Sequence, residues 1–93
     1  MSIADKAKEV VYGDRERTYG NPEKNLIVVA ELWSACTGAS IRAYDVTMMM
    51  ALLKIARLKN LPAHEDSMVD LIGYTLLHDE IVNPKNESEQ NLS

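Results

Sequence analysis

The chain has one cysteine, no phenylalanine, four glycines and three prolines among its 93 residues. A lone cysteine, Cys36, excludes an internal disulfide and a cysteine-based zinc site, and we expect it to be a buried thiol on a helix. The aromatic residues are four tyrosines and one tryptophan, and five methionines help to fill the core. A chain of this length forms one domain with a small core.

Basic clusters and long apolar runs are also missing. The formal net charge is −4 and no block of Lys or Arg stands out, so we expect neither duplex nucleic acid nor a membrane among the partners, although single phosphates can still be bound. No apolar region typical of a signal peptide opens the chain, and the longest apolar run, Val46 to Leu53, is far too short to span a bilayer. These absences predict a cytoplasmic protein.

Apolar residues recur at helical spacing in four segments, and no segment alternates with period two over a useful length. The four segments are residues 3–12, 22–37, 43–59 and a last one that begins between 64 and 66 and ends near 82. Asn21 and Pro22 are typical of a helix start, and Gly38 ends the second segment. The sequence therefore predicts an all-α fold, a compact bundle of about four helices in residues 1–83, followed by a polar flexible tail in residues 84–93.

The segment 43–59 is apolar almost all the way round, with the stretch DVTMMMALLKIARL at its centre. A helix that is apolar on every side has to be covered on every side, and three further helices from one small chain are few for that. We therefore expect a homo-oligomer with this segment near the interface. The alternative is a monomer that wraps the segment completely.

Two cations interrupt that apolar segment, and three polar residues follow on the next one. Lys54 and Arg57 share a narrow stripe, while Asp66, Asp70 and Tyr74 are spaced by four and line one face of the last helix. The link between the two segments is short, so they are expected to be antiparallel neighbours. One interpretation is a pair of buried salt bridges between the cations and the carboxylates. The other is a site in which the carboxylates hold Mg²⁺ and the cations neutralise substrate phosphates.

A connector near the N-terminus, within the stretch VYGDRERTYGNPEKN, repeats Tyr-Gly and carries two arginines. In one interpretation Arg15 or Arg17 reaches a phosphate, while Tyr19, Gly20 and Asn21 shape a pocket wall and begin the next helix. In the other, the connector is a tight turn with solvated arginines, in which tyrosine covers the core and glycine takes a positive φ. The residues alone leave both open.

Four stretches together resemble a small phage and prophage domain family of unknown function: GDRERTYGNPEKN, AELWSACTG, DVTMMMALLKIARL and HEDSMVDLIGY. The resemblance covers about residues 9 to 80. The layout is also similar to phage nucleotide-modification-associated domains and, more distantly, to the all-α MazG-like nucleoside triphosphate pyrophosphatases. The family resemblance implies a phage-encoded protein in the host cytosol. The wider one implies a MazG-like helical fold associated with nucleotides.

The MazG-like resemblance also implies a metal site. In those enzymes two helices supply E-x-x-E and E-x-x-D motifs that together bind Mg²⁺. Here Asp66 and Asp70 are spaced by four rather than three, and the second segment offers only Glu31, with Ser34 where a partner carboxylate would stand. The implied magnesium ligands are thus Asp66, Asp70 and Glu31.

Three functions follow as alternatives. The first is a nucleotide-binding oligomer that hydrolyses a (deoxy)nucleoside triphosphate with Mg²⁺, in which Lys54 and Arg57 stabilise the charge that grows on phosphate and Arg15, Arg17, Tyr19, Gly20, Asn21 and Tyr74 bind the substrate. The second is a phage binding protein without catalysis that sequesters a nucleotide signal or a host protein. The third is an interaction module with no small ligand.

Overall fold

The structure is a computed structural model that describes residues 1–12 and 21–84. Every regular element in these two ranges is an α-helix. The helices are α1 (Ile3–Tyr12), α3 (Pro22–Thr37), α4 (Ala43–Asn60) and α5 (Glu65–Val82). The predicted all-α class is confirmed, and each helix begins and ends within a residue or two of its expected bounds. None of the described helices is both long and apolar enough to cross a membrane.

Local capping chemistry explains the ends of α3. The side chain of Asn21 accepts hydrogen bonds from the backbone N–H groups of Glu23 (2.9 Å) and Lys24 (3.2 Å), and Pro22 occupies the first turn. At the other end Gly38 adopts a φ of 76°, and its N–H donates to the Ser34 carbonyl at 2.9 Å. The sequence signals for this helix are therefore confirmed at both ends.

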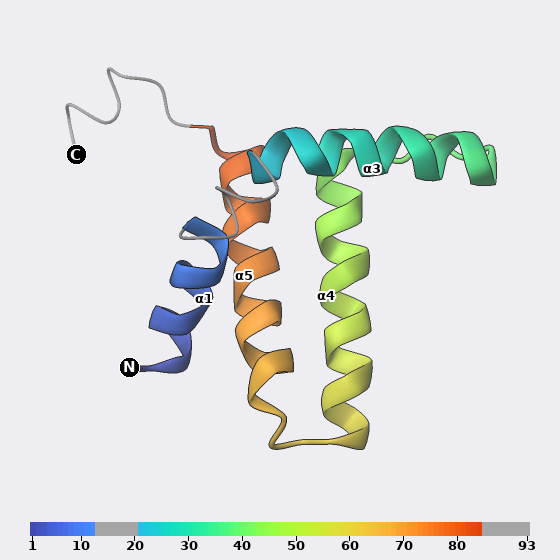
Figure 1. Cartoon of the computed structure of the whole chain (residues 1–93). Coiled ribbons are helices and arrows are strands. Elements are labelled where there is room, and N and C mark those ends of the chain that lie inside the picture. Colours follow the sequence, from blue (N-terminus) through green and yellow to red (C-terminus); the bar gives the residue numbers. More distant parts are fainter. Residues whose placement is uncertain (13–20, 85–93) are drawn as a thin grey trace, which may run out of the picture.

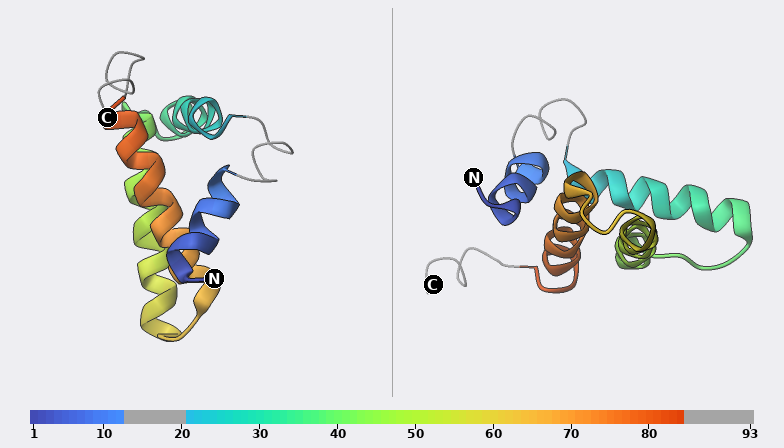
Figure 2. Two further views of the ribbon diagram at one scale, coloured as in Figure 1. Left: turned by 90° about the vertical axis from the view of Figure 1, so that its left-hand side faces the viewer. Right: turned by 90° about the horizontal axis from the view of Figure 1, so that it is seen from below.

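The helices α4 and α5 form an antiparallel hairpin, as the short link between them predicts (Figure 1). On the side of α5 away from α4, α1 packs against it, and α3 lies across the upper end of the hairpin, nearly at right angles to it (Figures 1 and 2). The C-terminal half of α3 runs out beyond α4. Cys36, in that half, is exposed, so the expectation of a buried thiol is wrong.

The core lies where α3 crosses the hairpin. Its buried side chains come from all four helices: Val11, Leu26, Ala30, Val46 and Leu77. Against α1 the packing is close because α5 carries a glycine there. A Cβ atom built on Gly73 would lie 3.1 Å from Val11 Cγ2, closer than such atoms normally approach. The absent side chain thus allows α1 to sit directly on the backbone of α5.

One face of α4 is not covered by the other described helices. Its exposed apolar side chains are Met48, Met49, Leu52, Leu53 and Ile55. Within the described residues α4 is therefore not covered on every side, and the expected homo-oligomer stays a prediction.

Candidate functional site

The four helices line a cavity of about 330 Å³ beside the core, partly open to solvent and within the size range of small-molecule sites. Apolar side chains from every helix form most of its wall, chiefly Val10, Val11, Leu26, Val29, Val46 and Leu77. Because these residues belong to the core face of each helix, the cavity is a gap in the packing under α3. An apolar gap of this size can hold a ring-sized ligand.

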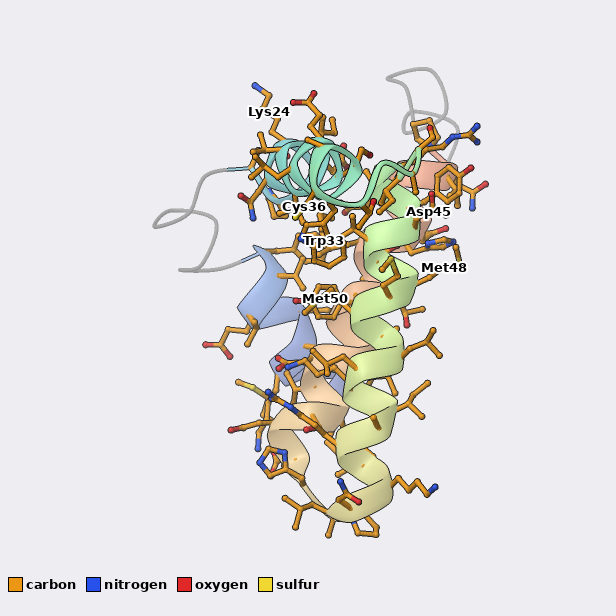
Figure 3. All side chains as sticks on the ribbon, turned by 90° about the vertical axis from the view of Figure 1, so that its right-hand side faces the viewer. Lys24, Trp33, Cys36, Asp45, Met48 and Met50 are labelled. Carbon is orange, nitrogen blue, oxygen red and sulfur yellow. The ribbon has the colours of Figure 1, made fainter. Side chains whose placement is uncertain are left out.

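A few polar and aromatic side chains interrupt the apolar wall. Trp33 and Asn25 reach the cavity from α3, and Tyr74 and Asp70 from α5. Figure 3 shows Trp33 on the underside of α3, directly above Met50 of α4, which also lines the cavity. The set offers two aromatic rings, a carboxylate that accepts hydrogen bonds and an amide that both donates and accepts them. Such a set can orient a planar, polar ligand.

The carboxylate of Asp70 is held by an ion pair. Lys54 Nζ lies 2.9 Å from Asp70 Oδ2, and the two side chains are only 10% and 30% exposed. This bond joins α4 to α5 and neutralises a carboxylate at the edge of the cavity. One of the two predicted salt bridges is therefore present.

The second predicted salt bridge is absent among residues 1–12 and 21–84. Arg57 and Asp66 are both exposed, and neither forms an ion pair with a described residue. Glu65, the neighbour of Asp66, instead bonds Lys6 of α1. The proposed cluster of two cations and two carboxylates thus reduces to one buried pair, and the catalytic roles assigned to Lys54 and Arg57 stay predictions.

The implied magnesium ligands are not brought together. Glu31 is exposed on α3 at one end of the hairpin, whereas Asp66 lies at the start of α5, at the other end (Figure 1). Asp70 lies between these ends and is paired with Lys54. Within the described ranges no group of three His, Cys, Asp or Glu residues is placed to hold a metal ion. These residues do not fit a shared Mg²⁺ site, so Mg²⁺ stays a prediction without structural support.

The predicted connector residues Arg15, Arg17, Tyr19 and Gly20 lie outside the described residues. Asn21 is described, and its side chain caps α3 instead of lining the cavity. The two ends of the connector nevertheless adjoin the cavity, because Val10 and Val11 line it from the end of α1 and Pro22 lines it from the start of α3.

An acidic group lies next to this rim. The pKa of Tyr12 is raised, first because partial burial disfavours the phenolate and then because Glu80 accepts its hydrogen bond and repels its charged form. Burial also raises the pKa of Glu23, and the charge and hydrogen bond of Glu80 raise it further. The ends of α1, α3 and α5 therefore meet at a cluster of acidic groups in which the pKa of Glu23 is raised.

We expect the substitution Glu80→Gln to stabilise the fold at pH 7 by about 0.5 kcal/mol, a value discounted for solvent screening. The pKa of Glu23 is raised on folding, so its carboxyl binds a proton more tightly in the folded state than in the unfolded state. The wild type therefore loses stability as pH rises from the ordinary Glu value of 4.5 through the raised value. The variant removes the part of that loss that the charge of Glu80 causes, and the part due to burial of Glu23 remains. Urea titrations between pH 4 and 8 measure the difference.

The matched control is Glu9→Gln, which removes the same charge from an exposed site on α1. If both variants change the pH dependence equally, net charge and not the Glu23–Glu80 contact is responsible. A difference in the free energy of unfolding between Glu80→Gln and wild type that does not change over this pH range would contradict the prediction.

Two features escaped the sequence analysis. Thr47, which interrupts the apolar helix, is 1% exposed, and its hydroxyl donates to the Tyr44 carbonyl and lies 2.8 Å from His78 Nδ1. It therefore links α4 to α5 through a partly buried hydrogen bond. The cavity itself was also missed, although its α3 wall, Val29 and Trp33 among others, is the apolar face that helical periodicity identifies.

Comparison with known proteins identifies the family of this chain. The domain of unknown function DUF6378 matches residues 2–82. The chain belongs to the DUF6378 family. This agrees with the resemblance to a phage and prophage family of unknown function.

Two relatives of this DUF6378 domain are "Gene 55" proteins of mycobacteriophages. The protein of Mycobacterium phage D29 is 38% identical over 73 residues, which is 78% of this chain and 48% of the relative. That of Mycobacterium phage L5 is 38% identical over 88 residues, or 94% of this chain and 56% of the relative. The chain thus spans about half the length of these relatives. No solved structure matches it.

Proposed function

We propose that this DUF6378 domain binds a nucleotide or a nucleotide-like small molecule, with the base in the cavity under α3, and that it does so without turnover. The observation that supports this most is the pairing of Trp33 and Tyr74 with Asp70 and Asn25 around one apolar cavity. Aromatic side chains stack on bases of any sequence, a contact worth about 1–3 kcal/mol per base.

The polar groups favour a base that carries an amino group. A carboxylate accepts a hydrogen bond from an exocyclic amine, as acidic side chains do with cytosine, and an asparagine amide can bond adenine in two places. Asp70 is oriented by its ion pair with Lys54, so its carboxylate can serve as that acceptor.

The charges at the rim of the cavity favour a ligand with few phosphate groups. Glu23 lies next to Pro22, which lines the cavity, and interacts with Glu80, so a polyphosphate would meet like charge there. The arginines predicted to bind phosphate, Arg15 and Arg17, belong to the connector whose two ends adjoin the cavity. A nucleoside or nucleoside monophosphate therefore suits the site better than a triphosphate.

Binding without hydrolysis fits the described geometry better than catalysis does. Phosphoryl chemistry relies on metal ions and cations placed on the phosphates, and the described residues offer no such metal-binding group. The predicted pyrophosphohydrolase activity is thus the alternative, and a requirement for Mg²⁺ separates the two.

We expect a nucleoside or nucleoside monophosphate at 100 times its dissociation constant to stabilise the domain by about 2.7 kcal/mol. For a domain of this size that raises Tm by roughly 10–20 °C. The measurement is a thermal-shift series with nucleosides, monophosphates and triphosphates, each with Mg²⁺ and with EDTA. The same shift in EDTA supports binding alone, whereas a shift that needs Mg²⁺ and a triphosphate would support the hydrolase.

Two variants on α3 localise the ligand. Asn25→Ala removes an exposed side chain that lines the cavity and should weaken binding about 5- to 10-fold, the loss of one hydrogen bond. Lys24→Ala changes the neighbouring side chain, which points away from the cavity in Figure 3, and should leave affinity unchanged. If no ligand raises Tm, the result would favour the alternative of an interaction module with no small ligand.

A further inference from the structure

The uncovered face of α4 is a continuous apolar stripe. Its five large side chains, Met48, Met49, Leu52, Leu53 and Ile55, are between 44% and 64% exposed. In the middle of the helix the one charged residue is Lys54, and it turns to the opposite side to pair with Asp70. Figure 3 shows Met48 pointing away from the side of α4 that carries Met50, so this end of the stripe faces away from the cavity.

The charges of this face stand only at its two ends. Asp45 lies in the first turn of α4 and Lys59 in the last. Each is seven residues from Leu52, so both lie two helical turns away from it, on the same side of the helix. The face is therefore an apolar centre with a negative end and a positive end.

We propose that this face is a homodimer interface, in which α4 packs antiparallel on α4 of a second copy around a two-fold axis at Leu52. Across a two-fold axis every contact occurs twice, because each copy offers the same surface to the other. It sets Leu52 against its own copy and Asp45 of each chain against Lys59 of the other. It also sets the two helix dipoles antiparallel, so that the positive end of each lies beside the negative end of the other.

Charge complementarity selects a second copy in this orientation. Packed in parallel, the same face would put Asp45 against Asp45 and Lys59 against Lys59, which is repulsive. The antiparallel arrangement turns both repulsions into attractions without any further partner.

The size of the stripe sets the expected affinity. A fully exposed aliphatic side chain presents roughly 60–120 Å² of apolar surface. Five such side chains, about half exposed, therefore bury roughly 300–600 Å² of apolar surface across the two copies. That apolar area is small beside the roughly 1,200–2,000 Å² of total surface that stable interfaces bury, so we expect a weak dimer that forms at micromolar concentrations or above.

Sedimentation equilibrium of the full 93-residue chain tests the proposal. The expected result is a mass that rises from 10.4 kDa towards twice that value between 1 and 200 μM. Leu52→Glu should raise the dissociation constant at least 100-fold and leave a monomer at the concentration where the wild type is half dimeric. Its circular dichroism should match the wild type, because the side chain is 64% exposed.

The matched control is Leu32→Glu, which puts the same charge at a 62% exposed leucine on α3, outside the stripe. It should dimerise like the wild type. Lys59→Glu tests the orientation: it sets like charges opposite each other twice, and should weaken the dimer about 5-fold at low salt and less at 0.5 M salt.

Three results would overturn the proposal. One is a wild-type monomer at 1 mM, and another is a Leu52→Glu variant that still dimerises. The third is loss of the dimer in Leu32→Glu, which would place the interface on α3. None of these outcomes bears on ligand binding in the cavity, so the two proposals fail separately.

Discussion

Replacing Asp70 with alanine is expected to lower the free energy of unfolding by about 3 kcal/mol, because it leaves a buried ammonium group without its partner. Lys54 is only 8% exposed, and its one ion pair in the described chain is with Asp70 at 2.9 Å. The carboxylate is 30% exposed, so the value lies at the low end for a broken buried pair. For a domain of this size the loss lowers Tm by more than 10 °C. Thermal and urea unfolding measure it.

The double variant Lys54→Met/Asp70→Ala is the control. Methionine fills the lysine site without a charge, so most of the lost stability should return. If the single variant lowers Tm by less than about 3 °C, the ion pair contributes little and Lys54 is solvated in solution.

Replacing Gly73 with leucine is expected to displace α1 from α5 and to cost about 3 kcal/mol. Even a Cβ at this position would lie 3.1 Å from Val11 Cγ2, and leucine adds three more carbons in the same space. The chief contact of α1 is with α5, so α1 should lose its amide protection before the other helices do. Hydrogen exchange of residues 3–12, together with Tm, measures the effect.

Two controls accompany this prediction. Gly73→Ala should change stability by less than about 1 kcal/mol, because a shift of a few tenths of an ångström and a gain in helix propensity nearly cancel. Thr75→Leu places the same side chain at an exposed position of α5 and should leave α1 protected. Full protection of α1 in Gly73→Leu would contradict the proposed packing.

The helices were predictable because their ends are coded locally. Asn21 and Pro22 start α3 and Gly38 ends it, whatever the rest of the fold does. The antiparallel pairing of α4 with α5 follows from a short link, and the Lys54–Asp70 pair follows from that pairing. These features depend on neighbours in the sequence.

The predictions that failed concern features set by the position at which α3 crosses the hairpin. No local sequence pattern specifies that position. That crossing separates Glu31 from Asp66, so spacing within one helix was no guide to a metal site. It also carries the end of α3 beyond α4 and exposes Cys36. The cavity is the gap that the same crossing leaves between Trp33 and the hairpin.

The most direct test of ligand binding uses the fluorescence of Trp33, the one tryptophan of the chain and part of the cavity wall. A nucleoside or nucleoside monophosphate that raises Tm is titrated into the protein in EDTA. We expect a saturable change in emission, with an affinity weakened about 5- to 10-fold in Asn25→Ala and unchanged in Lys24→Ala. Emission that stays constant while such a ligand stabilises the protein would place binding outside the cavity and contradict the proposal.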